Sequence, residues 1–164
     1  MTTVRLTTLP AVLRAEEYWL PVPDGNEAAR AIYRRHYSCR RYRDGRRPRK
    51  FVGPGEYLVL LGRDGKALFV WRRFRDLSGQ KGVNAAVFRN EGQRLSSELI
   101  REACRHAWRR WPGQRLYTYV DAGAIRSTNP GYCFIAAGWR RVGWTKGGRG
   151  RRPLAVLEIT PEDL

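Results

Sequence analysis

The feature that most constrains the fold is a strand, a helix and a second strand that follow one another in the middle of the chain. Residues 83–90 and 116–120 are rich in β-branched and aromatic side chains, as strands are. Between them, residues 96–111 have apolar side chains at helical spacing and are followed by a proline-glycine pair that ends a helix. Two strands joined through a helix normally lie parallel in one sheet. The chain is therefore expected to fold as an α/β protein.

Elements on either side are expected to extend this sheet. Residues 26–37 have helical periodicity and follow a capping aspartate or asparagine, and residues 51–74 have the pattern of a β-hairpin. Residues 1–25 are expected to form an edge strand and a proline-rich connection. The predicted fold is one α/β domain over residues 1–164, a mixed sheet flanked by helices.

Polar side chains are concentrated after the strand at 116–120. Asp121 ends that strand, and a cluster of turn-forming residues follows it. A short helix is expected to begin at Ser127 or Asn129 and to end at Gly138, before two further strands. Open α/β folds place their sites at the carboxyl ends of buried strands, so Asp121 is the first candidate site residue.

The net charge of +17, from 32 Lys and Arg against 15 Asp and Glu, restricts the partners. Such an excess repels itself unless a polyanion balances it, and arginine suits phosphates and base edges. Nucleic acid, here DNA, is therefore the leading partner. The alternative explanation of the charge is an arginine bias that comes from a GC-rich genome and needs no ligand. The expected contacts lie in a basic loop over residues 38–50 and in a glycine-rich loop near the C-terminus: Arg40, Arg41, Arg43, Arg46, Arg47, Arg49, Lys50, Lys146, Arg149, Arg151 and Arg152.

Other classes of protein are disfavoured. No apolar run approaches the roughly 20 residues of a membrane-spanning helix, and no signal peptide is recognised, so a cytoplasmic protein without a membrane partner is expected. Cys39, Cys104 and Cys133 form no CxxC pair, which argues against a cysteine zinc site. Cys104 is expected in the core, and His106 on the polar face of its helix.

A turn over residues 89–94 precedes the helix at 96–111, where free N–H groups and the helix dipole attract phosphate. Its Arg-x-x-Gly pattern resembles the pyrophosphate loop of the GCN5-related N-acetyltransferases (GNAT), although Arg94 stands where that family has a small residue. Residues 129–143 are similar to a second segment of that family. The resemblance implies a GNAT-like fold that binds acetyl-CoA or another acyl-CoA donor. The residues implied in cofactor binding are Arg89, Asn90, Gly92, Arg94, Ser96, Ser97, Asn129 and Tyr132.

A narrower resemblance covers most of the chain. Residues 34–41 (RRHYSCRR), 88–100 (FRNEGQRLSSELI) and 119–143 together resemble the Mom family of bacteriophage DNA-modification proteins. That family has a diverged acetyltransferase fold and converts the N6 amine of adenine in DNA to a carbamoylmethyl derivative, which blocks restriction enzymes. The resemblance implies an active site that includes His36, Tyr37 and Asp121.

Modification of adenine N6 needs a proton acceptor, a group that polarises the donor carbonyl, and access to the base. Asp121 and His36 are the candidate acid and base, and Arg126 or a backbone N–H beside the strand is the candidate polarising group. A flipped base would stack on a tyrosine such as Tyr37, whereas Tyr132 is expected in the core. His36, Tyr37 and Asp121 are alternatively candidate iron ligands through N and O atoms.

Three functions are therefore compared. The first is a Mom-type enzyme that modifies adenine in DNA and protects it from restriction. The second is an ordinary acetyl-CoA-dependent N-acetyltransferase acting on a small-molecule or protein amine. The third is a nucleic-acid-binding module without catalysis on an acetyltransferase scaffold.

Overall fold

The structure, a computed structural model, describes residues 17–124 and 131–164. The expected strand in the first part of the chain falls largely on residues 1–16, outside the described ranges. The elements, in chain order, are β1 (Trp19–Val22), α1 (Glu27–Arg34), β2 (Glu56–Gly62), β3 (Ala67–Arg73), β4 (Val83–Asn90), α2 (Ser96–Arg110), β5 (Leu116–Val120), α3 (Tyr132–Ala136), β6 (Arg140–Trp144), β7 (Ala155–Ile159) and a final 3₁₀ turn (Pro161–Asp163).

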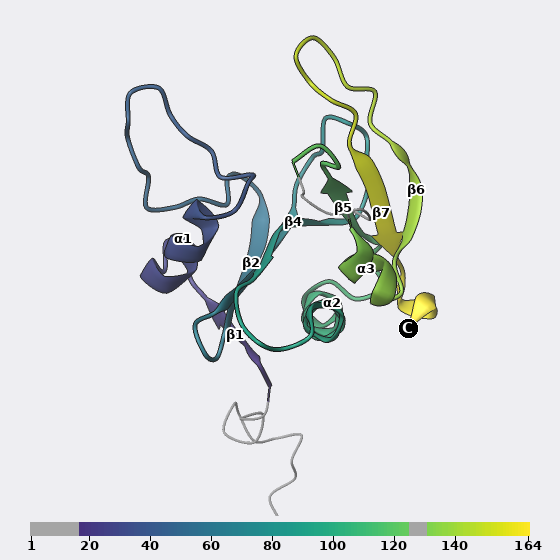
Figure 1. Cartoon of the computed structure of the whole chain (residues 1–164). Coiled ribbons are helices and arrows are strands. Elements are labelled where there is room, and N and C mark those ends of the chain that lie inside the picture. Colours follow the sequence, from purple (N-terminus) through teal and green to yellow (C-terminus); the bar gives the residue numbers. More distant parts are fainter. Residues whose placement is uncertain (1–16, 125–130) are drawn as a thin grey trace, which may run out of the picture.

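All seven strands belong to one mixed sheet with the order β1-β2-β3-β4-β5-β7-β6 (Figure 1). Strands β4 and β5 are parallel, and every other neighbouring pair is antiparallel. The parallel pair is joined through α2, so the expected strand, helix and strand unit is confirmed. The mixed α/β fold class is confirmed with it.

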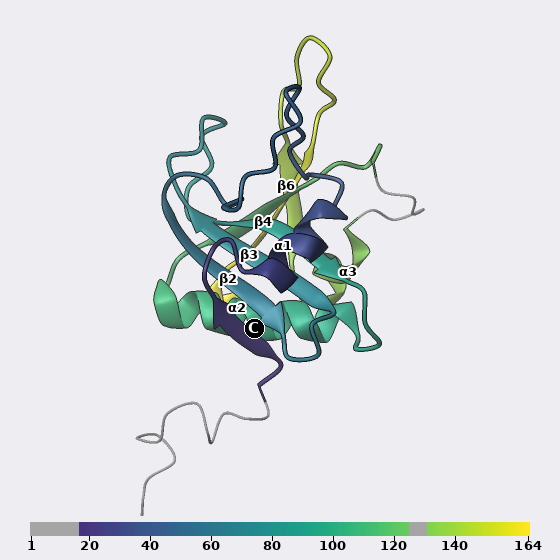
Figure 2. The same cartoon turned by 90° about the vertical axis from the view of Figure 1, so that its left-hand side faces the viewer.

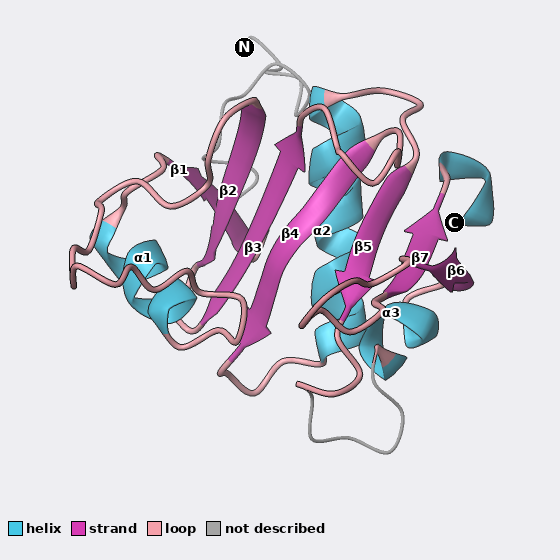
Figure 3. Cartoon of the chain, turned by 90° about the horizontal axis from the view of Figure 1, so that it is seen from above, coloured by secondary structure: helices cyan, strands magenta, loops and turns pink. Residues whose placement is uncertain are grey.

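The sheet is covered by α1 on one face and by α2 on the other, as Figures 1 and 3 show. Alternation along β3 supplies both layers: Leu68 and Val70 pack with the buried side chains of α1, whereas Phe69 and Trp71 pack with those of α2. Burial on both faces accounts for the nearly continuous apolar run of β3.

One expected connection is itself a strand. Residues Trp19–Val22, predicted as part of a proline-rich linker, pair antiparallel with β2 as β1. Pro21 is compatible with this pairing because β1 lies at the edge of the sheet, where a missing N–H leaves no neighbour unpaired.

Helix boundaries and one histidine also differ from expectation. Helix α1 begins after Asn26, whose side chain caps it as predicted, but it ends at Arg34, so His36 follows the helix. Helix α2 has Leu95 at its N-cap with no side-chain cap, whereas Ser96 or Ser97 was expected there. His106, expected at the surface, is only 9% exposed, and its ring lies 3.7 Å from the Glu17 carboxylate.

Within the described ranges, no helix combines the length and the apolar character needed to cross a bilayer.

Candidate functional site

The candidate site begins where β4 and β5 stop pairing. Their backbone ladder contains only Val83–Leu116 and Asn84–Tyr117. One step further along, the Thr118 hydroxyl donates to the Ala85 carbonyl at 2.9 Å, so a side chain replaces the ladder. Beyond this point no backbone pair joins the two strands. The opening between them is the result.

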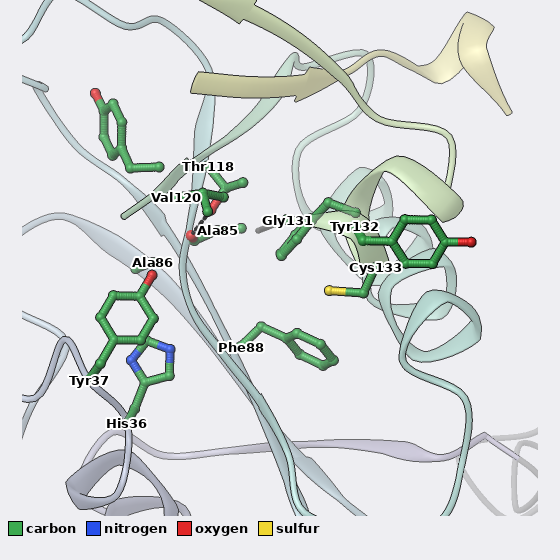
Figure 4. A pocket seen from close by; sticks show the side chains of 12 residues that line it. His36, Tyr37, Ala85, Ala86, Phe88, Thr118, Val120, Gly131, Tyr132 and Cys133 are labelled. Carbon is green, nitrogen blue, oxygen red and sulfur yellow. Dashed lines mark hydrogen bonds between the residues drawn. The ribbon is translucent and has the colours of Figure 1, made fainter. Parts of the chain in front are cut away.

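A cavity of about 310 Å³, here called the strand cavity, occupies this opening (Figure 4). Its walls come from residues just after α1, from β4 and β5, and from the start of α3. The volume is at the lower end of the range for small-molecule sites. The lining side chains are His36, Tyr37, Ala85, Ala86, Phe88, Thr118, Tyr119, Val120, Gly131, Tyr132, Cys133 and Phe134.

His36 is held against the first wall of this cavity by both ring nitrogens. The Ser38 backbone N–H donates to Nδ1 at 3.1 Å, and the Ser38 hydroxyl lies 2.7 Å from the same atom. The other nitrogen donates to the Phe88 backbone. Burial lowers the pKa of His36 to about 4, with the charge of Arg89 acting in the same direction. The ring is therefore neutral near pH 7 and connects the segment after α1 to β4.

Tyr37 and Asp121, which are 84 positions apart in sequence, lie next to each other. Burial raises the pKa of the Tyr37 hydroxyl; a backbone hydrogen bond from Asp121 opposes this shift, and the Asp121 carboxylate reinforces it. The Tyr37 ring packs on the His36 ring with centroids 4.3 Å apart and is 50% exposed. Tyr37 thus has one side toward the site and one side toward solvent.

The Asp121 carboxylate is divided between two partners. Its Oδ1 accepts from the Gly123 backbone N–H at 3.0 Å, which closes the turn after β5. Its Oδ2 pairs with the Arg152 guanidinium at 3.1 Å. Asp121 is therefore both the cap of this turn and the partner of a basic side chain that comes from the β6–β7 connection.

A backbone irregularity in β4 faces the same cavity. On the β3 side, Val70 pairs with Val87 and Trp71 pairs with Ala85, so Ala86 is the extra residue of a β-bulge. The extra residue of a bulge is left out of the ladder. Ala86 lines the strand cavity, so this irregular stretch of the β4 backbone lies at the cavity wall. Nothing in the sequence VNAAVFRN signals the bulge.

The α3 wall contributes a thiol that sequence reasoning did not select. The Cys133 sulfur points toward the cavity in Figure 4, and burial raises the pKa of this thiol. Tyr132, expected in the core, is 61% exposed, and its hydroxyl points away from the cavity. Helix α3 starts after Gly131, which has a φ of 82° and which approaches Val120 and Leu157 closely.

Tyr119 completes the lining through a network that sequence reasoning also missed. Asp76 accepts from Tyr117 at 2.8 Å and from Tyr119 at 2.6 Å, and it also accepts from Ser78. Burial and this carboxylate raise the pKa of Tyr119 to about 12. Tyr119 is therefore a neutral, fixed part of the wall.

The loop over residues 89–97 connects β4 to α2 and is organised by Asn90. Its side-chain amide donates to the Arg94 carbonyl at 2.7 Å and to the Ser96 hydroxyl at 3.0 Å, and its carbonyl accepts from the Gly92 N–H. The backbone N–H groups of Ser96 and Ser97, in the first turn of α2, have no acceptor within residues 17–124 and 131–164.

The positive charges of two arginines beside this loop are partly neutralised by Glu91, which belongs to the loop. Glu91 accepts two hydrogen bonds from Arg35, at 2.7 and 2.6 Å, and one from Arg89 at 2.6 Å. The bonds from Arg35 lower the pKa of Glu91 to about 2, and Arg89 acts in the same direction. Arg94 extends away from the loop, over the Tyr18 ring and toward Glu102. The expected cofactor residues from Arg89 to Ser97 are thus gathered in one loop, whereas Arg94 directs its charge elsewhere.

Two of the three candidate iron ligands are engaged with other partners in this structure. Both nitrogens of His36 are engaged by Ser38 and Phe88, and Asp121 is paired with Arg152. Within the described ranges, no group of three or more His, Cys, Asp and Glu side chains is arranged to hold a metal ion. No step at this site is therefore assigned to iron.

Two basic segments extend from the same end of the molecule (Figures 1 and 2). The first, residues 38–50, is called the loop arm, and the second, residues 145–154, is called the hairpin arm. The loop arm begins directly after Tyr37, and the hairpin arm is tied to Asp121 by Arg152. Every residue expected to contact DNA lies in one of these two arms.

Two of the expected site residues, Arg126 and Asn129, lie outside the described residues, as does Ser127. The structure otherwise brings His36 and Tyr37 to the strand cavity and places Asp121 next to Tyr37, outside the set of residues that line the cavity.

Fold and site together define a mixed α/β protein with a cavity between two parallel strands that separate. Comparisons with known protein families, with curated proteins and with solved structures found no match.

Proposed function

We propose that this protein is a DNA-modifying enzyme of the Mom type, which transfers a group to the N6 amine of adenine on a GNAT-like scaffold. The observation that supports this most directly is the link between the strand cavity and both basic arms. One arm continues from Tyr37, and the other is ion-paired to Asp121. Phosphates bound by the arms would bring a base to the cavity, as enzymes that act on extruded bases require.

The loop over residues 89–97 is the proposed site for the diphosphate of an acyl-CoA donor. The free N–H groups of Ser96 and Ser97 and the positive end of α2 favour an anion there. Arg35 and Arg89 stand beside them, partly neutralised by Glu91. When bound, the donor would supply an activated group. The gap between β4 and β5 offers its arm a path to the strand cavity.

Three groups of this chain would then act in the strand cavity or beside it. The backbone N–H of Ala86, the bulge residue, would donate to the carbonyl of the transferred group. The Tyr37 ring, exposed on one side, would stack on the adenine. Asp121 would accept the proton that N6 loses as the N6–C bond forms, while the C–S bond of the thioester would break and the coenzyme would leave as its thiolate. DNA phosphates that compete for Arg152 would free this carboxylate from its ion pair.

The proposed reaction is tested by nucleoside mass spectrometry of DNA from cells that express the chain. We expect a modified adenosine with the wild-type protein. With Asp121→Asn, we expect its amount to fall by a factor of about 10²–10⁴, the usual contribution of a general base. Duplex binding should be retained, because the variant removes no basic side chain.

Glu162→Gln serves as the matched control, since Glu162 is an exposed acid beyond β7 whose side chain has no partner among the residues that the structure describes. Undiminished modification by Asp121→Asn would exclude its role as the base. Unmodified adenine with folded wild-type protein would reject the Mom-type reaction, and retained duplex binding would then assign the chain to non-catalytic nucleic-acid binding. Turnover of acetyl-CoA on small amines without DNA would favour an ordinary N-acetyltransferase.

A further inference from the structure

A second and larger cavity, of about 750 Å³, lies beneath the loop arm and is here called the loop cavity. The loop arm, the C-terminal half of α1 and residues 51–54 enclose it, together with Arg72 of β3. It shares no lining residue with the strand cavity. Its volume falls within the range for sites that bind small organic ligands.

Positive charge dominates this cavity. Eight of its lining residues are Arg or Lys, and none is Asp or Glu. The side chains of Arg34, Arg41 and Lys50 have no ion-pair or hydrogen-bond partner within the described ranges. The nearby carboxylates are occupied, because Asp44 pairs with Arg46 at 3.7 Å and Asp24 accepts from the backbone N–H groups of Phe51 and Val52. Apart from the Asp44–Arg46 pair, no ion pair within the described ranges neutralises these eight basic side chains.

Positively charged side chains also lie near one another in the loop cavity. The Arg30 guanidinium is anchored to the backbone carbonyls of Arg47 and Pro48. Partial desolvation and the charges of Arg30 and Arg47 lower the pKa of Arg34. An arrangement that repels itself in the free protein is stabilised when an anion occupies it.

The cavity also has an aromatic and apolar wall. The rings of Tyr33 and Phe51 are stacked with centroids 4.7 Å apart and an interplanar angle of 15°. Tyr42 has guanidinium groups over its ring, from Arg40 at 4.9 Å and Arg46 at 4.2 Å. Val52 and Pro54 complete this wall. A phosphate alone would leave it uncovered, whereas a planar organic group would cover it.

We propose that the loop cavity binds one nucleotide unit, with its phosphate on the arginines and its base against the aromatic wall. The unit belongs either to a free nucleotide or to a nucleic-acid strand, because the two present the same chemistry. This proposal does not depend on modification of adenine in the strand cavity. It differs from simple phosphate contact along the loop arm, since it requires a base as well as a phosphate.

The test is titration calorimetry of the full chain with thymidine 5′-monophosphate, thymidine and deoxyribose 5-phosphate. A thymine probe avoids the adenine proposed for the strand cavity. We expect the nucleotide to bind at least about tenfold more tightly than either fragment, because each fragment lacks one of the two contacts. The thymidine trinucleotide separates the sources: tighter binding than the mononucleotide indicates a strand, and weaker binding indicates a free nucleotide.

Variants locate the binding. Arg34→Ala with Arg47→Ala should weaken the nucleotide at least about tenfold, since each removes a charge-assisted contact. The double variant should remain folded, because it relieves repulsion, and an unchanged or higher melting temperature verifies this. Arg105→Ala on α2, which is exposed and lies outside both cavities, is the matched control.

Undetectable binding of the nucleotide, or equal binding of nucleotide and deoxyribose 5-phosphate, would overturn the proposal. Equal affinity of the wild type and the double variant would overturn it as well. Asp121→Asn should leave nucleotide binding unchanged. Failure of the Mom-type reaction and failure of this site are therefore distinguishable.

Discussion

His36 shows how a histidine beside a cavity can be a positioning group. Its Nδ1 accepts from Ser38 and its other nitrogen donates to Phe88, so no lone pair remains to accept a proton from a substrate. The ring instead connects the start of the loop arm to β4 and supports Tyr37, which stacks on it. Of the two acid/base candidates, Asp121 is favoured by this geometry.

The pH dependence of stability tests this role of His36. Its pKa is about 4 in the folded protein against an ordinary value of 6.5, so below pH 6.5 the unfolded state binds more protons. The wild type should lose stability as the pH falls from about 6.5 to about 4, by roughly 1–3 kcal/mol from this group. His36→Asn should lose less over the same interval in thermal unfolding followed by circular dichroism.

Glu91 provides an internal comparison because its pH window is different. Its folded pKa of about 2 lies below the ordinary value of 4.5, so its contribution is lost only as the pH falls from about 4.5 toward 2. The His36→Asn variant should keep this lower transition. Identical pH profiles for the variant and the wild type would contradict a buried neutral histidine.

Among the elements, the loop between β4 and α2 depends on one side chain. Asn90 makes bonds to Gly92, Arg94 and Ser96, and so holds the turn that leaves the first N–H groups of α2 free. Gly92 fits there because a Cβ would come within 3.3 Å of Lys66 in the neighbouring hairpin turn. The geometry of the proposed donor site therefore comes from the loop as a unit.

Removal of the Asn90 side chain should loosen this loop. Asn90→Ala deletes three hydrogen bonds, so we expect a stability loss of about 1–3 kcal/mol. Acetyl-CoA affinity, measured by titration calorimetry, should fall about tenfold because the N–H groups are no longer fixed. Gln93→Ala, in the same loop but exposed, is the control. A loss of equal size in the control would show that Asn90 has no special role.

For the molecule as a whole, the excess of 17 positive charges is unevenly used. Arginines on the sheet and helices mostly find partners, as Arg140 does with Glu158 and Arg109 does with Glu17. The two arms hold many of the arginines and lysines that have none, and they extend from one end of the molecule (Figure 1). Such a distribution favours a long polyanion that both arms contact together.

Duplex binding should accordingly weaken steeply with salt. A plot of log K against log salt concentration has a slope of about −0.9 for each phosphate contact. Lys146→Ala with Arg149→Ala in the hairpin arm should reduce the magnitude of that slope by about 2, as measured by fluorescence anisotropy. Arg105→Ala should leave it unchanged. A slope near zero for the wild type would exclude DNA as the partner.

Local sequence patterns predicted much of the fold, and the family resemblance supplied the candidate site residues. Strand and helix periodicity predicted the crossover from β4 through α2 to β5, because side-chain burial repeats along each element. Of the residues expected in the active site, His36 and Tyr37 line the strand cavity and Asp121 lies beside Tyr37, and their catalytic role stays a prediction. The edge strand β1 was missed since prolines normally interrupt strands, and His106 was placed outside because its partner Glu17 is remote in sequence.

Side-chain types and their periodicity are properties of short segments, so they were sufficient for the fold class and for the basic arms. The bulge at Ala86, the opening between β4 and β5, the pairing of Asp121 with Arg152 and the loop cavity all depend on contacts between distant segments. Such contacts arise only when the whole chain packs, because burial, strand register and charge pairing all depend on which distant segments come into contact. The chemistry available at each cavity is therefore a property of the folded chain.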